Sequence, residues 1–188
     1  MPHHSQIGVD LGLTDQEKKS LHQIARTTIE ARTAGTTLPA CKTPTPTLQE
    51  KRGAFVSLHR KGELRGCIGY IHAVKPLCET IREMAIAAAF QDPRFPPLRS
   101  DELADLDIEI SVLTPMRQIN DITEIEVGKH GLMIVQGNYS GLLLPQVAAD
   151  YGWSREEFLK HTCMKAGLPQ TAWKEKNSKI FVFSADVF

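Results

Sequence analysis

The sequence predicts an α+β fold in which a mixed, largely antiparallel sheet is flanked by helices. Two β-hairpins and two single strands give about six strands, and three or four amphipathic helices are interspersed with them. The strands follow one another in hairpins rather than in regular βαβ units, which favours antiparallel pairing. A chain of 188 residues is long enough for one substantial core, or for a main domain with a smaller lobe.

The first helix is predicted to begin at a capping box, in which Thr14 and Glu17 can each accept from the other's backbone amide. Its buried side follows at helical spacing and comprises Leu21, Ile24, Ala25, Thr28 and Ile29. Residues 35–53 contain prolines, including Pro44 after Thr43, which remove backbone donors. We therefore expect an ordered but irregular connection there.

Residues 54–71 are predicted to form a β-hairpin whose turn lies near Lys61 and Gly62. With a two-residue turn, Cys67 lies opposite Val56. In the same register Arg65 lies opposite Leu58, whereas a longer turn would exchange the two faces.

A second helix is expected after Pro76, which suits a first helical turn. Its buried side comprises Leu77, Ile81, Met84, Ala85, Ala88 and Ala89. Residues 91–98 then form a loop stiffened by three prolines. In this loop Asp92 and Arg94 can pair with each other, cap the helix end or contact a ligand.

The C-terminal half begins with a strand at residues 107–113, which alternate strictly and turn Glu109 away from the apolar face. A second hairpin follows at residues 132–145, with His130 at its entrance. A capping box at Ser154 starts another helix, and residues 179–183 form a last strand inside the sheet.

Composition excludes several function classes. The 22 basic and 22 acidic residues balance, so we expect no nucleic-acid binding through bulk charge. The sequence has no apolar run of about 18 residues, so no membrane span is expected. Residues 1–6 lack signal-peptide character, and four widely spaced cysteines fit free thiols in a reducing compartment. The expected location is cytoplasmic.

Residues 64–69 (LRGCIG), called the hexapeptide below, place a thiol between two glycines and two residues from a guanidinium. Glycine in a strand often marks a bulge or a close approach by another group. Arg65 and Cys67 are expected to share a face of the strand, and a neighbouring cation favours the thiolate. Two interpretations stay open: a reactive or ligand-contacting thiol, or a small buried hydrophobic residue.

Further segments join the hexapeptide in a pattern that spans nearly the whole chain. They are residues 53–56, 92–95 with Pro97 and Leu98, 110–113, 130–132 and 142–147, then Trp153 and residues 165–168. Together they resemble the AMMECR domain family. The resemblance implies one AMMECR-type domain over residues 1–188. Its larger lobe would hold both termini and the C-terminal half, its smaller lobe would come from parts of residues 35–105, and the hexapeptide would lie near the cleft between them.

Stand-alone prokaryotic members of this family look like component A of the AmmeMemoRadiSam system. The resemblance therefore implies a Memo-type protein and a radical SAM protein as possible partners, but it supplies no activity.

A catalytic or small-ligand site is the first functional hypothesis. Cys67 would be the nucleophile or the ligand contact, with Arg65 lowering its pKa and holding an anionic group. His130 or Glu109 would be the candidate base. The sequence has no G-x-S-x-G motif, P-loop or dinucleotide fingerprint, and it gives no support for a metal or another cofactor.

The ligand-binding residues under this hypothesis are Gly66 and Gly69, whose neighbouring amides can approach a ligand or an oxyanion. Asp92 and Arg94 join them from the proline-rich loop. The alternative hypothesis is a non-catalytic adaptor or protein-interaction module, in which the glycines serve tight packing and Cys67 is an inert core residue.

Overall fold

The computed structural model describes residues 9–41 and 45–188. The expectations for residues 1–6 and for Thr43 and Pro44 lie outside the described residues. The chain divides into two compact units. One, called the hexapeptide unit, comprises Leu11–Leu113 with Val187–Phe188; the other, called the second unit, comprises Thr114–Asp186 with residues 9 and 10.

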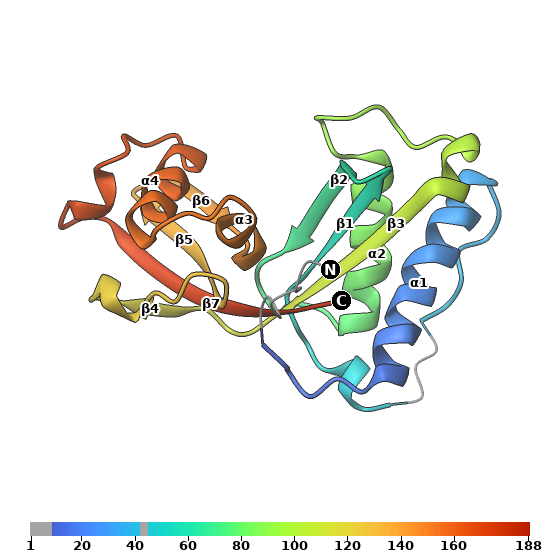
Figure 1. The fold of residues 1–188 in the computed structure, drawn as a ribbon. Helices are drawn as coiled ribbons and strands as arrows, with labels where there is room; N and C mark the ends of the chain where they lie inside the picture. Colours follow the sequence, from blue (N-terminus) through green and yellow to red (C-terminus); the bar gives the residue numbers. More distant parts are fainter. Residues whose placement is uncertain (1–8, 42–44) are drawn as a thin grey trace, which may run out of the picture. The chain divides into compact units, whose positions relative to one another are not determined.

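The hexapeptide unit is a three-stranded antiparallel sheet with two helices on one face (Figure 1). Its elements are α1 (Asp15–Thr33), η1 (Thr47–Gln49), β1 (Ala54–Arg60), β2 (Glu63–Tyr70), α2 (Leu77–Phe90), η2 (Ser100–Asp105) and β3 (Leu106–Leu113). β1 lies in the middle and pairs with β2 and β3. Phe188 exchanges two backbone hydrogen bonds with Ile110, so the C-terminus continues the sheet beyond β3.

Local sequence signals explain these elements. The capping box of α1 is present, with Glu17 N donating to Thr14 Oγ1 at 3.2 Å and Thr14 N donating to Glu17 at 2.9 Å. The residues predicted for the buried side of α2 are all buried. They pack with those of α1 against Val56, Leu58 and Ile110 on the inner face of the sheet. Each helix contributes one apolar stripe to this core, as the spacing predicts.

The predicted register of the first hairpin is wrong by one residue. The two-residue turn is confirmed, since Lys61 and Gly62 have φ of 52° and 82° and Arg60 pairs with Glu63. However, a bulge shifts the ladder after Leu58, so Cys67 lies opposite Ser57 instead of Val56. Directly opposed residues share a face, and the bulge therefore turns the thiol away from the face that packs on α2.

The second unit combines a small antiparallel sheet with two helices. Its elements are β4 (Arg117–Ile119), η3 (Ile122–Glu124), β5 (His130–Gln136), β6 (Tyr139–Leu143), α3 (Pro145–Asp150), α4 (Arg155–Lys165), η4 (Ala172–Lys174) and β7 (Lys179–Val187). β7 pairs with β4 and β5, and β5 pairs with β6. Phe158 and Leu159 of α4 pack into a core with Leu132 and Ile134 of β5.

Two elements of this unit are absent from the sequence prediction. Pro145 was expected to end a strand, whereas it occupies the first turn of α3, where proline is well tolerated. β4 has three residues, too few to give a periodic signal. The α+β class with largely antiparallel sheets flanked by helices is confirmed. The assignment to one domain with a larger lobe, a smaller lobe and a cleft stays a prediction.

Candidate functional site

The two glycines that flank Cys67 allow close packing on both faces of β2. A Cβ atom at Gly66 would collide with the backbone carbonyl oxygen of Ala88 in α2. A Cβ atom at Gly69 would collide with the Phe55 ring and would lie 2.6 Å from the Ala54 carbonyl oxygen. Only glycine fits at either position, because distances under 3.0 Å are essentially never observed for real Cβ atoms.

Asp92 and Arg94 bind the backbone of Cys67 with their side chains. β2 pairs with β1 on one side, and the Cys67 N–H donates to Asp92 Oδ2 at 2.9 Å. The Cys67 carbonyl oxygen accepts from Arg94 Nη2 at 3.3 Å. The two side chains are themselves joined by a fork, Nε to Oδ1 at 2.9 Å and Nη2 to Oδ2 at 2.7 Å. The N–H and the carbonyl oxygen of Cys67, on the edge of β2 that faces away from β1, are thereby hydrogen-bonded as they would be by a further strand.

The Asp92 carboxylate is held in its charged form. Its side chain is only 1% exposed, and hydrogen bonding by Arg94 lowers its pKa despite the opposing effect of burial. A buried carboxylate that accepts four hydrogen bonds is expected to behave in this way. Asp92 is therefore a fixed anion that anchors the loop to the hexapeptide.

The Cys67 thiol lies in a polar row that crosses three strands. Ser57 Oγ donates to Cys67 Sγ at 3.1 Å, and Glu109 of β3 lies opposite Ser57. Burial raises the pKa of the Cys67 thiol, and the hydrogen bond from Ser57 and the charge of Arg94 oppose this only in part. The thiol is consequently protonated at neutral pH, contrary to the expectation of a favoured thiolate.

Arg65 does not act on Cys67 as the sequence suggested. Its guanidinium forms a bidentate pair with Glu102 of η2, Nε to Oε1 at 2.9 Å and Nη2 to Oε2 at 3.0 Å. The side chains are 12% and 9% exposed, and hydrogen bonding by Arg65 lowers the Glu102 pKa to about 2. The expectation that Arg65 lowers the thiol pKa is wrong, because the cation that acts on the thiol is Arg94.

A small cavity of about 210 Å³ lies beside the Arg65–Glu102 pair. Its walls comprise Arg60, Arg65, Pro96, Pro97, Arg99, Asp101 and Glu102, which gives three guanidinium groups against two carboxylates. Two nitrogen atoms of these side chains, Nη1 of Arg65 and Nε of Arg60, are buried and have no hydrogen-bond partner among the described residues. Buried donors in proteins are nearly always paired, so these two nitrogens are unusual.

His130 belongs to the second unit, at the start of β5. Its Nδ1 accepts from the Glu126 amide at 3.2 Å, and burial lowers its pKa. A role as base for Cys67 stays a prediction. Among the described residues, no group of three or more His, Cys, Asp or Glu side chains is arranged to hold a metal ion.

The structure thus brings Cys67, Asp92, Arg94 and Glu109 together and turns Arg65 toward a different partner. Sequence analysis missed Ser57, because the bulge that aligns it with Cys67 leaves no pattern. It also missed Glu102, 37 residues from Arg65 along the chain. The charged run of residues 99–105 was a possible signal for Glu102, although it could not reveal the partner.

No helix in residues 9–41 and 45–188 is long and apolar enough to cross a membrane.

Comparison with known proteins gives a family for the chain. The AMMECR1 family model matches residues 22–188. A protein of Methanothermobacter thermautotrophicus is 44% identical over 183 residues, which cover 94% of this chain and 95% of that protein. Protein MK0488 of Methanopyrus kandleri is 48% identical over 156 residues, covering 78% of this chain and 75% of its own.

A solved structure is similar over nearly the same span. The crystal structure of the uncharacterized protein PH0010 from Pyrococcus horikoshii superposes with a TM-score of 0.88 at 40% sequence identity. The match covers 93% of this chain and 92% of that one. The chain belongs to the AMMECR1 family.

Proposed function

We propose that the hexapeptide unit binds a small anionic molecule in the cavity beside Arg65. The observation that carries this proposal is the buried Nη1 of Arg65, a charged donor without a hydrogen-bond partner among the described residues. A donor left unsatisfied in the interior destabilises the protein by about 1–3 kcal/mol, and by more when it is charged. An anionic oxygen in the cavity would satisfy it through a short, charge-assisted hydrogen bond.

The charges around the cavity support the same proposal. Glu102 occupies only Nε and Nη2 of Arg65, so Nη1 keeps its donor capacity for a ligand. Arg60 and Arg99 supply two more guanidinium groups at the wall. Guanidinium is the side chain best suited to phosphate and carboxylate, because its planar donors match their oxygens.

Binding is better supported than catalysis by the thiol. A nucleophilic cysteine needs a lowered pKa, whereas burial raises that of Cys67. Asp92 and Arg94, proposed from sequence as ligand contacts, are engaged with each other and with the Cys67 backbone. Catalysis by Cys67 with His130 or Glu109 as base stays a prediction.

Titration with inorganic phosphate tests the proposal, with binding followed by calorimetry. Arg65→Lys keeps a positive charge beside Glu102 but loses Nη1, and we expect at least about ten-fold weaker binding, the equivalent of one charged hydrogen bond. Arg60→Gln should also weaken binding. Arg52→Gln is the matched control, because Arg52 pairs with Glu50 outside the cavity and its loss should leave binding unchanged.

Absence of saturable phosphate binding by the unmodified protein would overturn the proposal. Equal binding by Arg65→Lys would overturn the role of Arg65.

The resemblance also implies component A of the AmmeMemoRadiSam system, with Memo-type and radical SAM partner proteins. That assignment, direct contact with such partners, and a cytoplasmic location stay predictions.

A further inference from the structure

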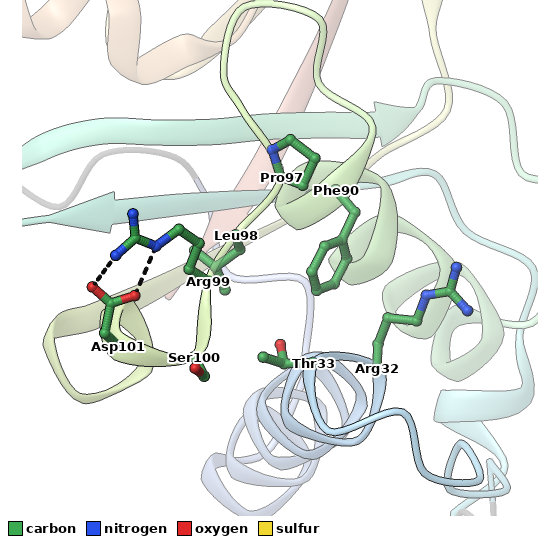
Figure 2. A pocket seen from close by; sticks show the side chains of 8 residues that line it. All are labelled: Arg32, Thr33, Phe90, Pro97, Leu98, Arg99, Ser100 and Asp101. Atoms are coloured by element: carbon green, nitrogen blue, oxygen red, sulfur yellow. Dashed lines mark hydrogen bonds and ion pairs between the residues drawn. The ribbon is translucent and has the colours of Figure 1, made fainter.

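Residues 34–41 leave the end of α1 and reach the first turn of α2. They follow Thr33, the last residue of α1, which Figure 2 shows at the wall of a cavity of about 860 Å³. Residues 36–41 form neither helix nor strand. The Pro39 carbonyl oxygen accepts from Arg82 Nη1 of α2 at 3.4 Å, and the Cys41 thiol donates to the Cys78 carbonyl oxygen at 3.2 Å. Side-chain hydrogen bonds thus hold an irregular segment against a helix.

Cys41 and Cys78 are neighbours in the fold although they are 37 residues apart along the chain. The carbonyl oxygen that Cys41 contacts belongs to Cys78 itself. The two thiols also act on each other, since burial raises the pKa of Cys41 to about 11 and the charge and hydrogen bond of the Cys78 thiol raise it further in the same direction. A disulfide requires Cα atoms about 4.4–6.8 Å apart. A thiol that contacts both the backbone and the thiol of its partner has the proximity that such a bond needs.

The exposure of the two thiols differs. Cys41 is partly exposed, whereas Cys78 is 1% exposed. An oxidant from solvent therefore reaches Cys41 first, and Cys78 lies beside the product. The remaining cysteines have other surroundings, because Cys67 contacts Ser57 and Cys163 belongs to the second unit.

We propose that Cys41 and Cys78 form a reversible disulfide that fastens residues 34–41 to α2 when a peroxide is present. The Cys41 thiolate attacks one oxygen of hydrogen peroxide, the O–O bond breaks, and Cys41 becomes a sulfenic acid as water leaves. The Cys78 thiolate then attacks the Cys41 sulfur, the S–O bond breaks, and a second water leaves as the S–S bond forms. The two thiol protons leave in the two waters, and the two sulfur atoms together give two electrons to the peroxide.

The disulfide should stabilise the folded protein. A cross-link between residues 37 positions apart restricts the unfolded chain, and this restriction grows with the length of the closed loop. We expect the oxidised protein to unfold with a Tm at least about 5 °C above that of the reduced protein. Dithiothreitol should reverse the rise, because thiol–disulfide exchange returns both thiols.

Oxidation of the folded protein with hydrogen peroxide tests the proposal, followed by chymotrypsin digestion without reductant and mass spectrometry. Chymotrypsin cleaves after Tyr70 and so separates Cys67 from Cys78. We expect the peptides that hold Cys41 and Cys78 to be joined, with the loss of two hydrogens, and to separate in dithiothreitol. Cys67→Ser is the matched control and should keep both the link and the rise in Tm. Cys41→Ser should lose both.

Oxidation of the same protein in urea gives the pairing expected without a fold. A folded sample with no more of the Cys41–Cys78 link than the urea sample would overturn the proposal. Oxidation of Cys41 to a sulfinic acid, with Cys78 left as a free thiol, would overturn it as well. A link that forms without raising the Tm would overturn the fastening of residues 34–41 to α2.

Discussion

Replacement of Gly66 by alanine is a direct test of how the hexapeptide packs. The new Cβ would collide with the Ala88 carbonyl oxygen and lie at 3.0 Å from its carbon, so β2 or α2 must move. Both colliding groups are backbone, and neither can rotate away. Overpacking in a rigid core typically destabilises by 1–3 kcal/mol, and we expect the upper end, about 3 kcal/mol. For a chain of this size that corresponds to a fall in Tm of about 6–12 °C.

Urea denaturation followed by circular dichroism measures this loss, since a change in midpoint at constant slope reports stability. Gly62→Ala is the matched control in the same hairpin. It has φ of +82° but open space around its would-be Cβ, so it should lose only about 1 kcal/mol through backbone strain. A loss in Gly66→Ala no greater than in Gly62→Ala would refute the close approach of α2 to the hexapeptide.

Three further predictions follow from the surroundings of Cys67. Asp92→Ala should destabilise by about 3 kcal/mol in urea denaturation because it leaves the partly buried Cys67 N–H without its acceptor and Arg94 without its partner. Arg94→Ala, which leaves the buried Asp92 carboxylate without its guanidinium partner, should lose a comparable amount, about 3 kcal/mol; a loss under about 1 kcal/mol would contradict this account. The pKa of Glu102 is lowered from 4.5 to about 2, so its stabilising effect, about 3 kcal/mol, is present above pH 4.5 and is lost as pH falls toward 2. Glu102→Gln should flatten that part of the pH–stability curve, and an unchanged slope would argue against the Arg65 pair. Because its pKa is raised, Cys67 should react with iodoacetamide at pH 7.5 more slowly than glutathione, by peptide mass spectrometry, and rapid labelling would restore the catalytic hypothesis.

Periodic patterns predicted most of the fold. The α1 and α2 faces, the hairpin turn at Lys61 and Gly62 and the alternating strand β3 all depend on local spacing, and the structure confirms them. The β-bulge near Arg65 escaped prediction because a single extra residue changes the ladder without changing the residue types. That one residue decides the face on which the thiol lies.

The site was predicted only where its residues are close in the sequence. The Asp92–Arg94 pair, two residues apart in a stiff loop, was among the expected possibilities. Glu102, the partner of Arg65, is 37 residues away in the sequence. No local pattern around Arg65 indicates which acidic residue it pairs with. The cavity beside Arg65 depends on side chains from β1, β2, η2 and the loop before η2, whose convergence only a folded chain reveals.

The most direct test of the anion site is the response of Arg65 itself, observed by arginine side-chain NMR during titration with inorganic phosphate. The signals of its guanidinium protons should shift in a saturable way, because Nη1 acquires an acceptor that the described residues do not supply. Arg117, paired with Glu124 in the second unit, should stay unchanged. Shifts confined to exposed arginines, with Arg65 unaffected, would contradict the account.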